Sequence, residues 1–188
     1  MSNEGSTTYK HPGNLSVRLA LFWLTSCSDN NSQFYLNRAE EMLKEHGLGM
    51  ECWSSRTRTD QMNIQFADRL VERDDYDFLF EKSSEILSGA SKFNYLPLFF
   101  CQFRFTAHGL TVSDTPTKCY IKPIILVDPL FAGSDKVTLL HEIGHAAGLD
   151  HDRTSTDPNK RNFMNEADTR TTMFKWQIEK MAKSFFVN

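Results

Sequence analysis

The stretch from Thr138 to His151, TLLHEIGHAAGLDH, places the strongest constraint on how this chain can fold. His141 and His145 are four residues apart, so on an α-helix both imidazoles project from the same face, one turn apart. Gly148 can end such a helix in the left-handed conformation, which a residue with a Cβ adopts only at a cost. The chain then turns sharply and His151 returns to the same side. The pattern predicts a helix, a glycine turn and three imidazoles around one point.

Histidines in this arrangement are typical of a metal site. Neutral imidazole is a common zinc ligand, and three protein ligands plus a water describe a catalytic zinc ion. Two histidines at helical spacing also occur as a capped or core-lining pair, but the glycine and the third histidine at the right offsets favour a metal. We therefore expect one catalytic zinc ion held by His141, His145 and His151. Glu142 lies beside the first ligand, where its carboxylate can reach the water rather than the metal.

This stretch resembles the metzincin family of zinc endopeptidases, whose pattern HExxHxxGxxH is matched at all five fixed positions. The family also carries a methionine turn beneath the zinc, and Met164, within the sequence NFMN, is well placed for that turn. The resemblance covers residues 134–165 closely and the remainder as a compatible outline. It implies that Met164 is a packing floor under the histidines and not a ligand.

The resemblance implies hydrolysis of peptide bonds. Zinc can lower the pKa of its bound water from near 16 to about 7 and polarise the carbonyl. Glu142 is then the expected general base, taking the proton from the water and passing it to the leaving amine. The expected substrate is a protein or peptide, bound in extended form by backbone pairing with an edge strand, for which residues 105–113 are the candidate. His108 lies in that stretch, and we leave this lone histidine out of the metal site.

Two departures prevent a subfamily assignment. The second residue after Met164 is Glu166, so the tyrosine ligand of some metzincins is not expected here. Asp152 follows the third histidine, as in adamalysin-like members, but the cysteines of their next loop are missing. Two other functions stay open: a catalytically inactive metzincin-like protein-binding module, and a zinc hydrolase acting on a non-peptide amide. The intact Glu142 argues against the first, because loss of the base is the simplest route to an inactive site.

The fold implied by the resemblance is an α+β, metzincin-like (zincin) fold. It has a mixed, mostly parallel twisted sheet with an edge strand along the cleft, a long zinc-binding helix, and a small C-terminal subdomain ending in a helix. The 188 residues suit a single metallopeptidase catalytic domain, and we expect a monomer. We divide the chain into a flexible arm at 1–14, an upper subdomain at 15–148 and a lower subdomain at 149–188.

Apolar runs and turn residues place the individual elements. Strands are predicted at 15–25, 49–58, 95–105 and 119–127. Helices are predicted at 33–46, ended by Gly47; at 136–148, capped by Ser134 or Asp135; and at 171–185. Residues 60–90 carry no recognisable motif: 60–73 suits a helix or a long loop, and 75–87 has mixed periodicity ending in a helical turn.

Charge and cysteine content narrow the possible partners. The net charge of −3 and the lack of a long basic run give no indication of nucleic acid binding. The cysteines are scattered without CxxC pairing, so they do not predict a second metal site. Two disulfides in any of three connectivities, or thiols, stay open, and Cys101 and Cys119 could face each other across a hairpin. The four cysteines are Cys27, Cys52, Cys101 and Cys119.

The apolar run at residues 19–24, LALFWL, raises the question of targeting, and the following Cys27 ends a segment resembling a lipoprotein cleavage box. The run is shorter than a usual signal core, follows a polar stretch containing Pro12 and Gly13, and is too short to span a bilayer. We read it as a buried first strand, with no membrane span and no clear signal peptide. Localisation stays open between secretion or export, implied by the resemblance, and the cytoplasm.

Overall fold

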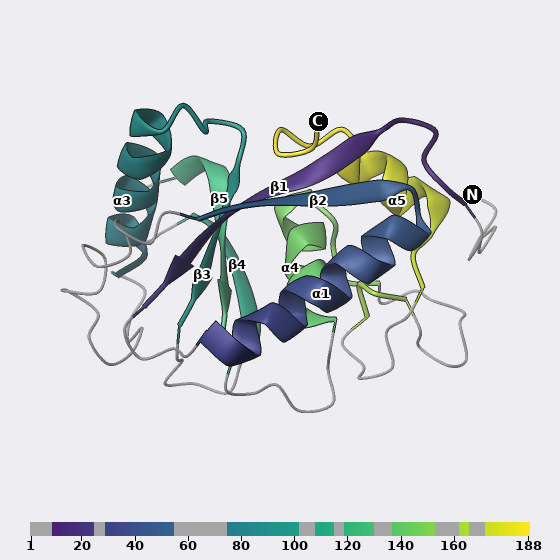
Figure 1. The fold of residues 1–188 in the computed structure, drawn as a ribbon, viewed down its shortest axis with the longest axis horizontal. Coiled ribbons are helices and arrows are strands. Elements are labelled where there is room, and N and C mark those ends of the chain that lie inside the picture. Colours follow the sequence, from purple (N-terminus) through teal and green to yellow (C-terminus); the bar gives the residue numbers. More distant parts are fainter. Residues whose placement is uncertain are drawn as a thin grey trace.

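The computed structural model describes residues 9–24, 29–54, 75–101, 108–114, 119–129, 137–152, 162–165 and 172–188. These residues form an α+β fold with a five-stranded sheet and helices around it (Figure 1). The strand order is β2-β1-β3-β5-β4, in which β4 is antiparallel to β5 and the other neighbouring pairs are parallel. The predicted α+β class with a mostly parallel sheet is confirmed.

The strands coincide with the apolar runs of the sequence. Their bounds are β1 Leu15–Trp23, β2 Leu48–Ser54, β3 Leu96–Phe100, β4 Gly109–Asp114 and β5 Cys119–Val127. Strands are confirmed within the predicted ranges 15–25, 49–58, 95–105 and 119–127, although residues 25, 55–58 and 102–105 lie outside the described part of the chain. The candidate edge strand at 105–113 overlaps β4, which is the last strand of the sheet that the described residues form; residues 105–107 lie outside the described part of the chain.

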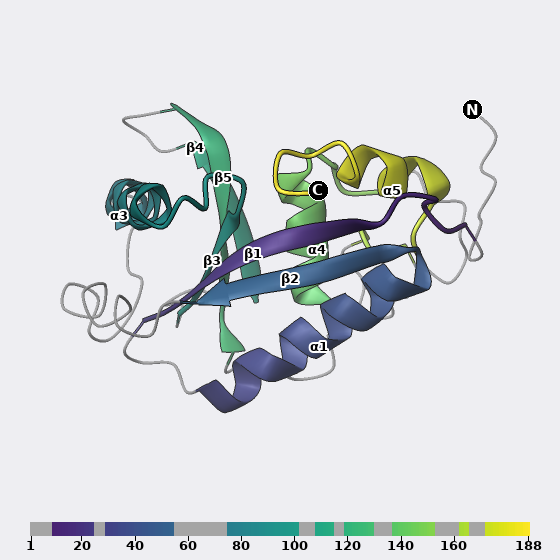
Figure 2. The same cartoon turned by 45° about the horizontal axis from the view of Figure 1, so that its top comes forward.

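Both faces of the sheet are buried, as is typical of parallel sheets. Alternate residues of β1 point to opposite sides: Val17 and Leu19 join one core, and Ala20 and Phe22 join the other. The first core is covered by α1 (Asp29–Glu45), α4 (Thr138–Ala146) and α5 (Lys175–Met181), and the second by α3 (Asp75–Gly89). Accordingly, α3 and α5 lie at opposite ends of the molecule in both views (Figures 1 and 2).

Three helix boundaries differ from the prediction. Helix α1 begins at Asp29 and not at residue 33, because Asp, Asn and Ser suit the first turn of a helix as well as its N-cap. Helix α5 is shorter than the predicted 171–185, since after Met181 the chain turns back toward β1. Residues 75–87, which had mixed periodicity, form most of the single helix α3.

The helix that carries the histidines is also shorter than predicted. Helix α4 has nine residues, so the expectation of a long helix at 136–148 is wrong at both ends. Its N-cap is Val137, which makes no side-chain capping bond. The predicted caps, Ser134 and Asp135, lie outside the described residues. At the other end, Gly148 takes φ +77°, so the helix stops before it.

The C-terminal segment returns to the first strand. The backbone N–H of Ser16 donates to Asn188 O at 2.8 Å, the Asn188 N–H donates back to Ser16 O at 3.1 Å, and the Arg18 N–H donates to Phe186 O at 2.8 Å. These bonds fix the end of the chain against β1. The division into an upper subdomain at 15–148 and a lower one at 149–188 stays a prediction.

The proposed facing of Cys101 and Cys119 is wrong. Strands β3 and β5 are parallel neighbours, and the Cys101 N–H donates to Val127 O at the far end of β5, whereas Cys119 begins that strand. The length of β5 therefore separates the two residues by roughly 26 Å, far beyond the reach of a disulfide. Cys52 and Cys101 are thiols, which excludes two disulfides among the four cysteines.

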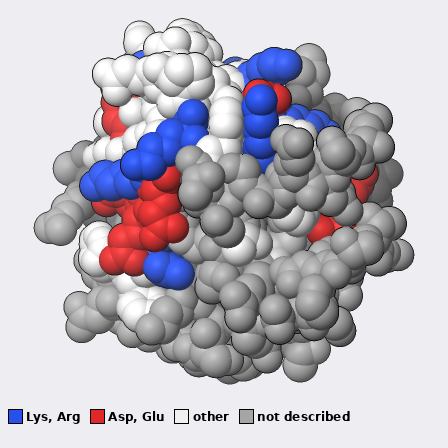
Figure 3. All heavy atoms as spheres, turned by 90° about the vertical axis from the view of Figure 1, so that its right-hand side faces the viewer, with Lys and Arg blue, Asp and Glu red and all other residues white. Residues whose placement is uncertain are grey.

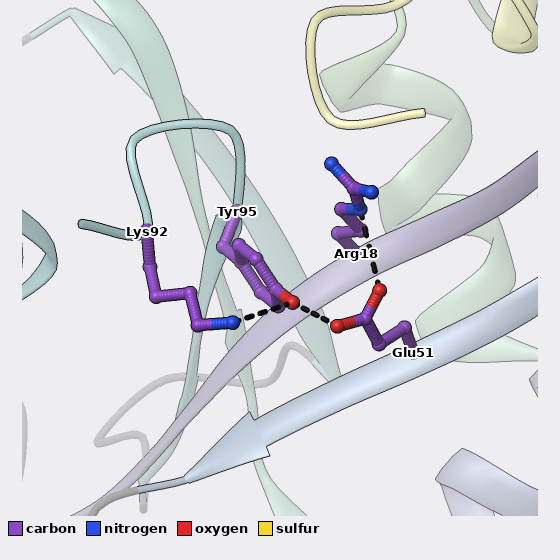
Figure 4. A network of polar contacts seen from close by, with 4 residues as sticks. All are labelled: Arg18, Glu51, Lys92 and Tyr95. Atoms are coloured by element: carbon purple, nitrogen blue, oxygen red, sulfur yellow. Dashed lines mark hydrogen bonds and ion pairs between the residues drawn. The ribbon is translucent and has the colours of Figure 1, made fainter. Parts of the chain in front are cut away.

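The surface of the described residues carries opposite charges side by side. One face of the molecule shows Lys and Arg next to Asp and Glu (Figure 3). Another example links β1, β2 and the turn before β3. There Glu51 accepts hydrogen bonds from Tyr95 and Arg18, and Lys92 Nζ donates to the Tyr95 hydroxyl (Figure 4). Among the described helices, none is long and apolar enough to cross a membrane.

Candidate metal centre

The turn after α4 has the geometry that the sequence predicted for Gly148. The Gly148 N–H donates to His145 O at 2.8 Å and the Leu149 N–H donates to Gly144 O at 2.9 Å. These two bonds form the Schellman motif, which ends a helix with a glycine in the left-handed region. Lys180 of α5 also donates to Gly148 O. The turn therefore reverses the chain shortly after His145 and brings His151 back beside His141 and His145.

The structure brings the three predicted ligands together. The Nε2 atoms of His141 and His145 are 3.1 Å apart, those of His141 and His151 are 3.1 Å apart, and those of His145 and His151 are 3.0 Å apart. His141 is buried, and the other two are partly buried. These histidines could hold a metal ion. Among the described residues, this group does not include His108.

The opposite ring nitrogens are held by backbone carbonyls. His141 Nδ1 lies 2.8 Å from Phe163 O, and His145 Nδ1 lies 2.8 Å from Leu149 O. Because a carbonyl only accepts, both Nδ1 atoms must carry the hydrogen, and in a neutral ring Nε2 is then an acceptor. Burial lowers the pKa of His141 to about 4 and also lowers the pKa of His145, so both rings are neutral at neutral pH.

This donor set fits a metal ion. Neutral Nε2 lone pairs repel one another when they converge, and a cation between them removes that repulsion. Around a tetrahedral zinc with Zn–N of about 2.0–2.1 Å, two ligand nitrogens lie roughly 3.3–3.4 Å apart. The separations of 3.0–3.1 Å found here are close to that value. Carbonyl partners on the other ring nitrogen are the usual companions of histidine ligands.

Met164, which was predicted to lie in a methionine turn, is fully buried and packs against α4. A Cβ added at Gly144 would overlap Met164 Sδ and would come within 2.9 Å of the Phe163 ring. Gly144 therefore allows the methionine to pack against the helix between His141 and His145. The sequence does contain a signal for this role of Gly144. Glycine inside a helix lowers helix stability by about 1 kcal/mol relative to alanine, so a glycine at this position indicates close packing against the helix.

Glu142 is buried against the edge strand. The Thr111 hydroxyl lies 2.6 Å from Glu142 Oε2 and 2.9 Å from the Glu142 carbonyl oxygen. A Cβ at Gly109 would come within 2.8 Å of Glu142 Cγ, so glycine is needed for this close approach. Burial raises the pKa of Glu142 to about 7, against the opposing effect of the Thr111 hydrogen bond. The sequence alone did not identify Gly109 and Thr111 as neighbours of Glu142, because their contact with it depends on the tertiary fold.

No protein-family model matches the chain, and no curated protein sequence matches it significantly. The chemistry of the centre must therefore be inferred from this chain's own residues. They combine three convergent imidazoles with a buried carboxylate, that of Glu142, on the helix that carries His141 and His145.

Proposed function

We propose that this chain is a zinc-dependent endopeptidase with a metzincin-like fold. The observation that carries the proposal is the convergence of three Nε2 atoms, 3.0–3.1 Å apart. Two of them belong to α4, the helix that also carries Glu142, and the third belongs to His151 after the glycine turn. The match to HExxHxxGxxH and the buried Met164 under α4 support the same function.

His141, His145 and His151 would hold the zinc ion through Nε2. When bound, zinc at such a site lowers the pKa of a coordinated water to about 7 and acts as a Lewis acid on a carbonyl. The Nδ1–H bonds to Phe163 O and Leu149 O keep two of the rings in the tautomer that presents Nε2. Because these rings are already neutral, they bind a metal without first losing a proton.

Glu142 is the general base in this proposal. Its carboxylate takes a proton from the attacking water and returns it to the leaving amine nitrogen. A pKa of about 7 is close to neutral pH, and a general base works best when its pKa is near the working pH. Thr111 holds one carboxylate oxygen, which fixes the direction of the group.

Strand β4 is the proposed binding site for an extended peptide. It pairs with β5 on one side and is the last strand in the sheet order, so its other edge can accept a further strand from the substrate. Thr111 on this strand contacts Glu142, which places the strand next to the proposed base. This arrangement favours a peptide substrate over a small non-peptide amide, and the retained Glu142 argues against an inactive binding module.

Cleavage of an unstructured protein tests the proposal. We expect hydrolysis at internal peptide bonds that is abolished by a chelator and restored by adding zinc. Mass spectrometry of the fragments identifies the cleaved bonds. A zinc-loaded, folded protein that cleaves no member of a broad peptide library would contradict the proposal and would favour the binding module.

A further inference from the structure

A pair of amide side chains, Asn162 and Gln177, is fully buried between the methionine turn and α5. Asn162 Nδ2 donates to Gln177 Oε1 at 2.9 Å, and Gln177 Nε2 donates to Asn162 Oδ1 at 2.9 Å. Burying polar groups of this kind costs stability unless each has a partner. An apolar pair of similar size would fill the same space without the need for polar partners. We therefore ask what the hydrogen bonds of this pair hold in place.

Each amide oxygen also accepts a backbone N–H. Gln177 Oε1 accepts from Phe174 N at 2.9 Å, at the start of α5, and Asn162 Oδ1 accepts from Met164 N at 2.9 Å. Both lone pairs of both oxygens are thus used. The pair links the first turn of α5 to the backbone of the methionine turn in one defined geometry.

The Met164 N–H belongs to the same peptide group as the Phe163 carbonyl. A trans peptide is planar, so fixing its N–H fixes its C=O in the opposite direction, and no cis peptide bond occurs among the described residues. That carbonyl oxygen accepts from His141 Nδ1 at 2.8 Å. A continuous chain of hydrogen bonds therefore runs from Gln177 through Asn162 and this peptide group to the imidazole of His141.

We propose that Asn162 and Gln177 are positioning residues of the metal centre. They orient the Phe163 carbonyl, which holds His141 in the tautomer and rotamer that present Nε2 to the metal. The inference rests on the proposed zinc site. Cooperative polarisation along the chain also makes the Phe163 carbonyl a stronger acceptor. His145 provides an internal comparison, because its Nδ1 partner is Leu149 O in the turn after α4, which the amide pair does not contact.

The test compares two substitutions on the buried face of α5. Gln177→Met replaces the amide by an apolar side chain of similar length, and Met181→Leu changes a fully buried neighbour one turn further along. Zinc dissociation constants are measured by competition with a chromophoric chelator. Losing a direct partner of a metal ligand usually weakens metal binding about 10–100-fold. Because Gln177 acts through Asn162 and the Phe163–Met164 peptide group, we expect Gln177→Met to weaken zinc binding by about tenfold, the low end of that range, and Met181→Leu to leave it within about twofold.

Nuclear magnetic resonance of the zinc-loaded proteins gives the second readout. In Gln177→Met the Nδ1–H signal of His141 should shift or exchange faster, whereas the signal of His145 should not change. Equal zinc affinity of the two variants, or equal perturbation of both histidine signals, would overturn the inference. Failure of the wild-type protein to bind zinc would overturn the inference together with the zinc site.

If Gln177→Met does not fold, a measurement on the wild-type protein tests the positioning role of Asn162 and Gln177. Binding free energies are reciprocal, so a pair that positions a zinc ligand must itself be stabilised by zinc. Hydrogen exchange of the Met164 amide and the Asn162 side-chain amide should slow when zinc is added. Exchange that is unchanged by zinc would refute the positioning role.

Discussion

Two glutamates in this protein accept a hydrogen bond from a hydroxyl group, and their surroundings have opposite effects on them. Glu142 is 6% exposed and is held by Thr111, and burial raises its pKa to about 7. The Glu51 side chain is 47% exposed and is held by Tyr95. That hydrogen bond and the charges of Arg18 and Lys92 lower the pKa of Glu51.

Both carboxylates have a hydroxyl partner, so the partner does not explain why their pKa values shift in opposite directions. The cause is that Glu142 is removed from water whereas Glu51 is exposed and lies near two cations. A carboxylate near water and two cations stays ionised, which suits a structural link between β1, β2 and the start of β3 (Figure 4). A carboxylate removed from water exchanges its proton near neutral pH, which suits transfer of that proton. The comparison supports Glu142 as the proposed general base and indicates a modest structural role for Glu51.

The largest effect is expected from Glu142→Gln. The amide preserves size but removes the base, so kcat should fall by at least the roughly 10²–10⁴-fold typical of general acid–base catalysis. Zinc content should be unchanged, because Glu142 is not a ligand. Peptide cleavage and zinc content are measured on the same samples. Near wild-type cleavage would remove Glu142 from the mechanism.

Thr111→Val should have a smaller effect on the same step. Valine keeps the shape but removes the hydroxyl that holds Glu142 Oε2, and one hydrogen bond to a charged group is worth about 1.5–3 kcal/mol. We expect kcat to fall about tenfold or more with KM nearly unchanged, and Thr111→Ser to recover most of the loss. Steady-state kinetics on the three proteins gives the answer, and a Thr111→Ser protein as slow as Thr111→Val would point to packing.

Glu51→Gln should leave cleavage unchanged and slightly lower thermal stability at neutral pH. Because the folded-state pKa of Glu51 is depressed, its contribution is present above the ordinary glutamate pKa of about 4.3 and disappears as pH falls through the lower folded value. The gap in Tm between wild type and Glu51→Gln should therefore close on acidification. A gap that persists or widens in acid would show that the ionised carboxylate is not what stabilises this network.

The local part of the metal centre could be predicted from the sequence. His141, His145, Gly148 and His151 lie within one short stretch, where helix geometry and a glycine turn determine their relative positions. Most strands could also be located, because apolar runs covered on both faces leave a clear pattern. Met164 was predicted through the family resemblance and not through spacing.

The supporting residues could not be predicted in this way. Thr111, Asn162 and Gln177 are brought near the centre only by the packing of the sheet and α5, and isolated polar residues carry no periodic signal. Helix ends were uncertain for a related reason: polar residues at an N-terminus fit both a cap and a first turn, so α1 began earlier than predicted.

The zinc content of His145→Ala tests the central claim most directly. Wild-type protein and a matched His108→Ala variant, altered outside the histidine cluster, are loaded with zinc, desalted and analysed for metal. We predict stoichiometric zinc in the wild type and in His108→Ala, and loss of most zinc from folded His145→Ala. Undiminished zinc in His145→Ala would show that the ligands lie elsewhere and would contradict the account.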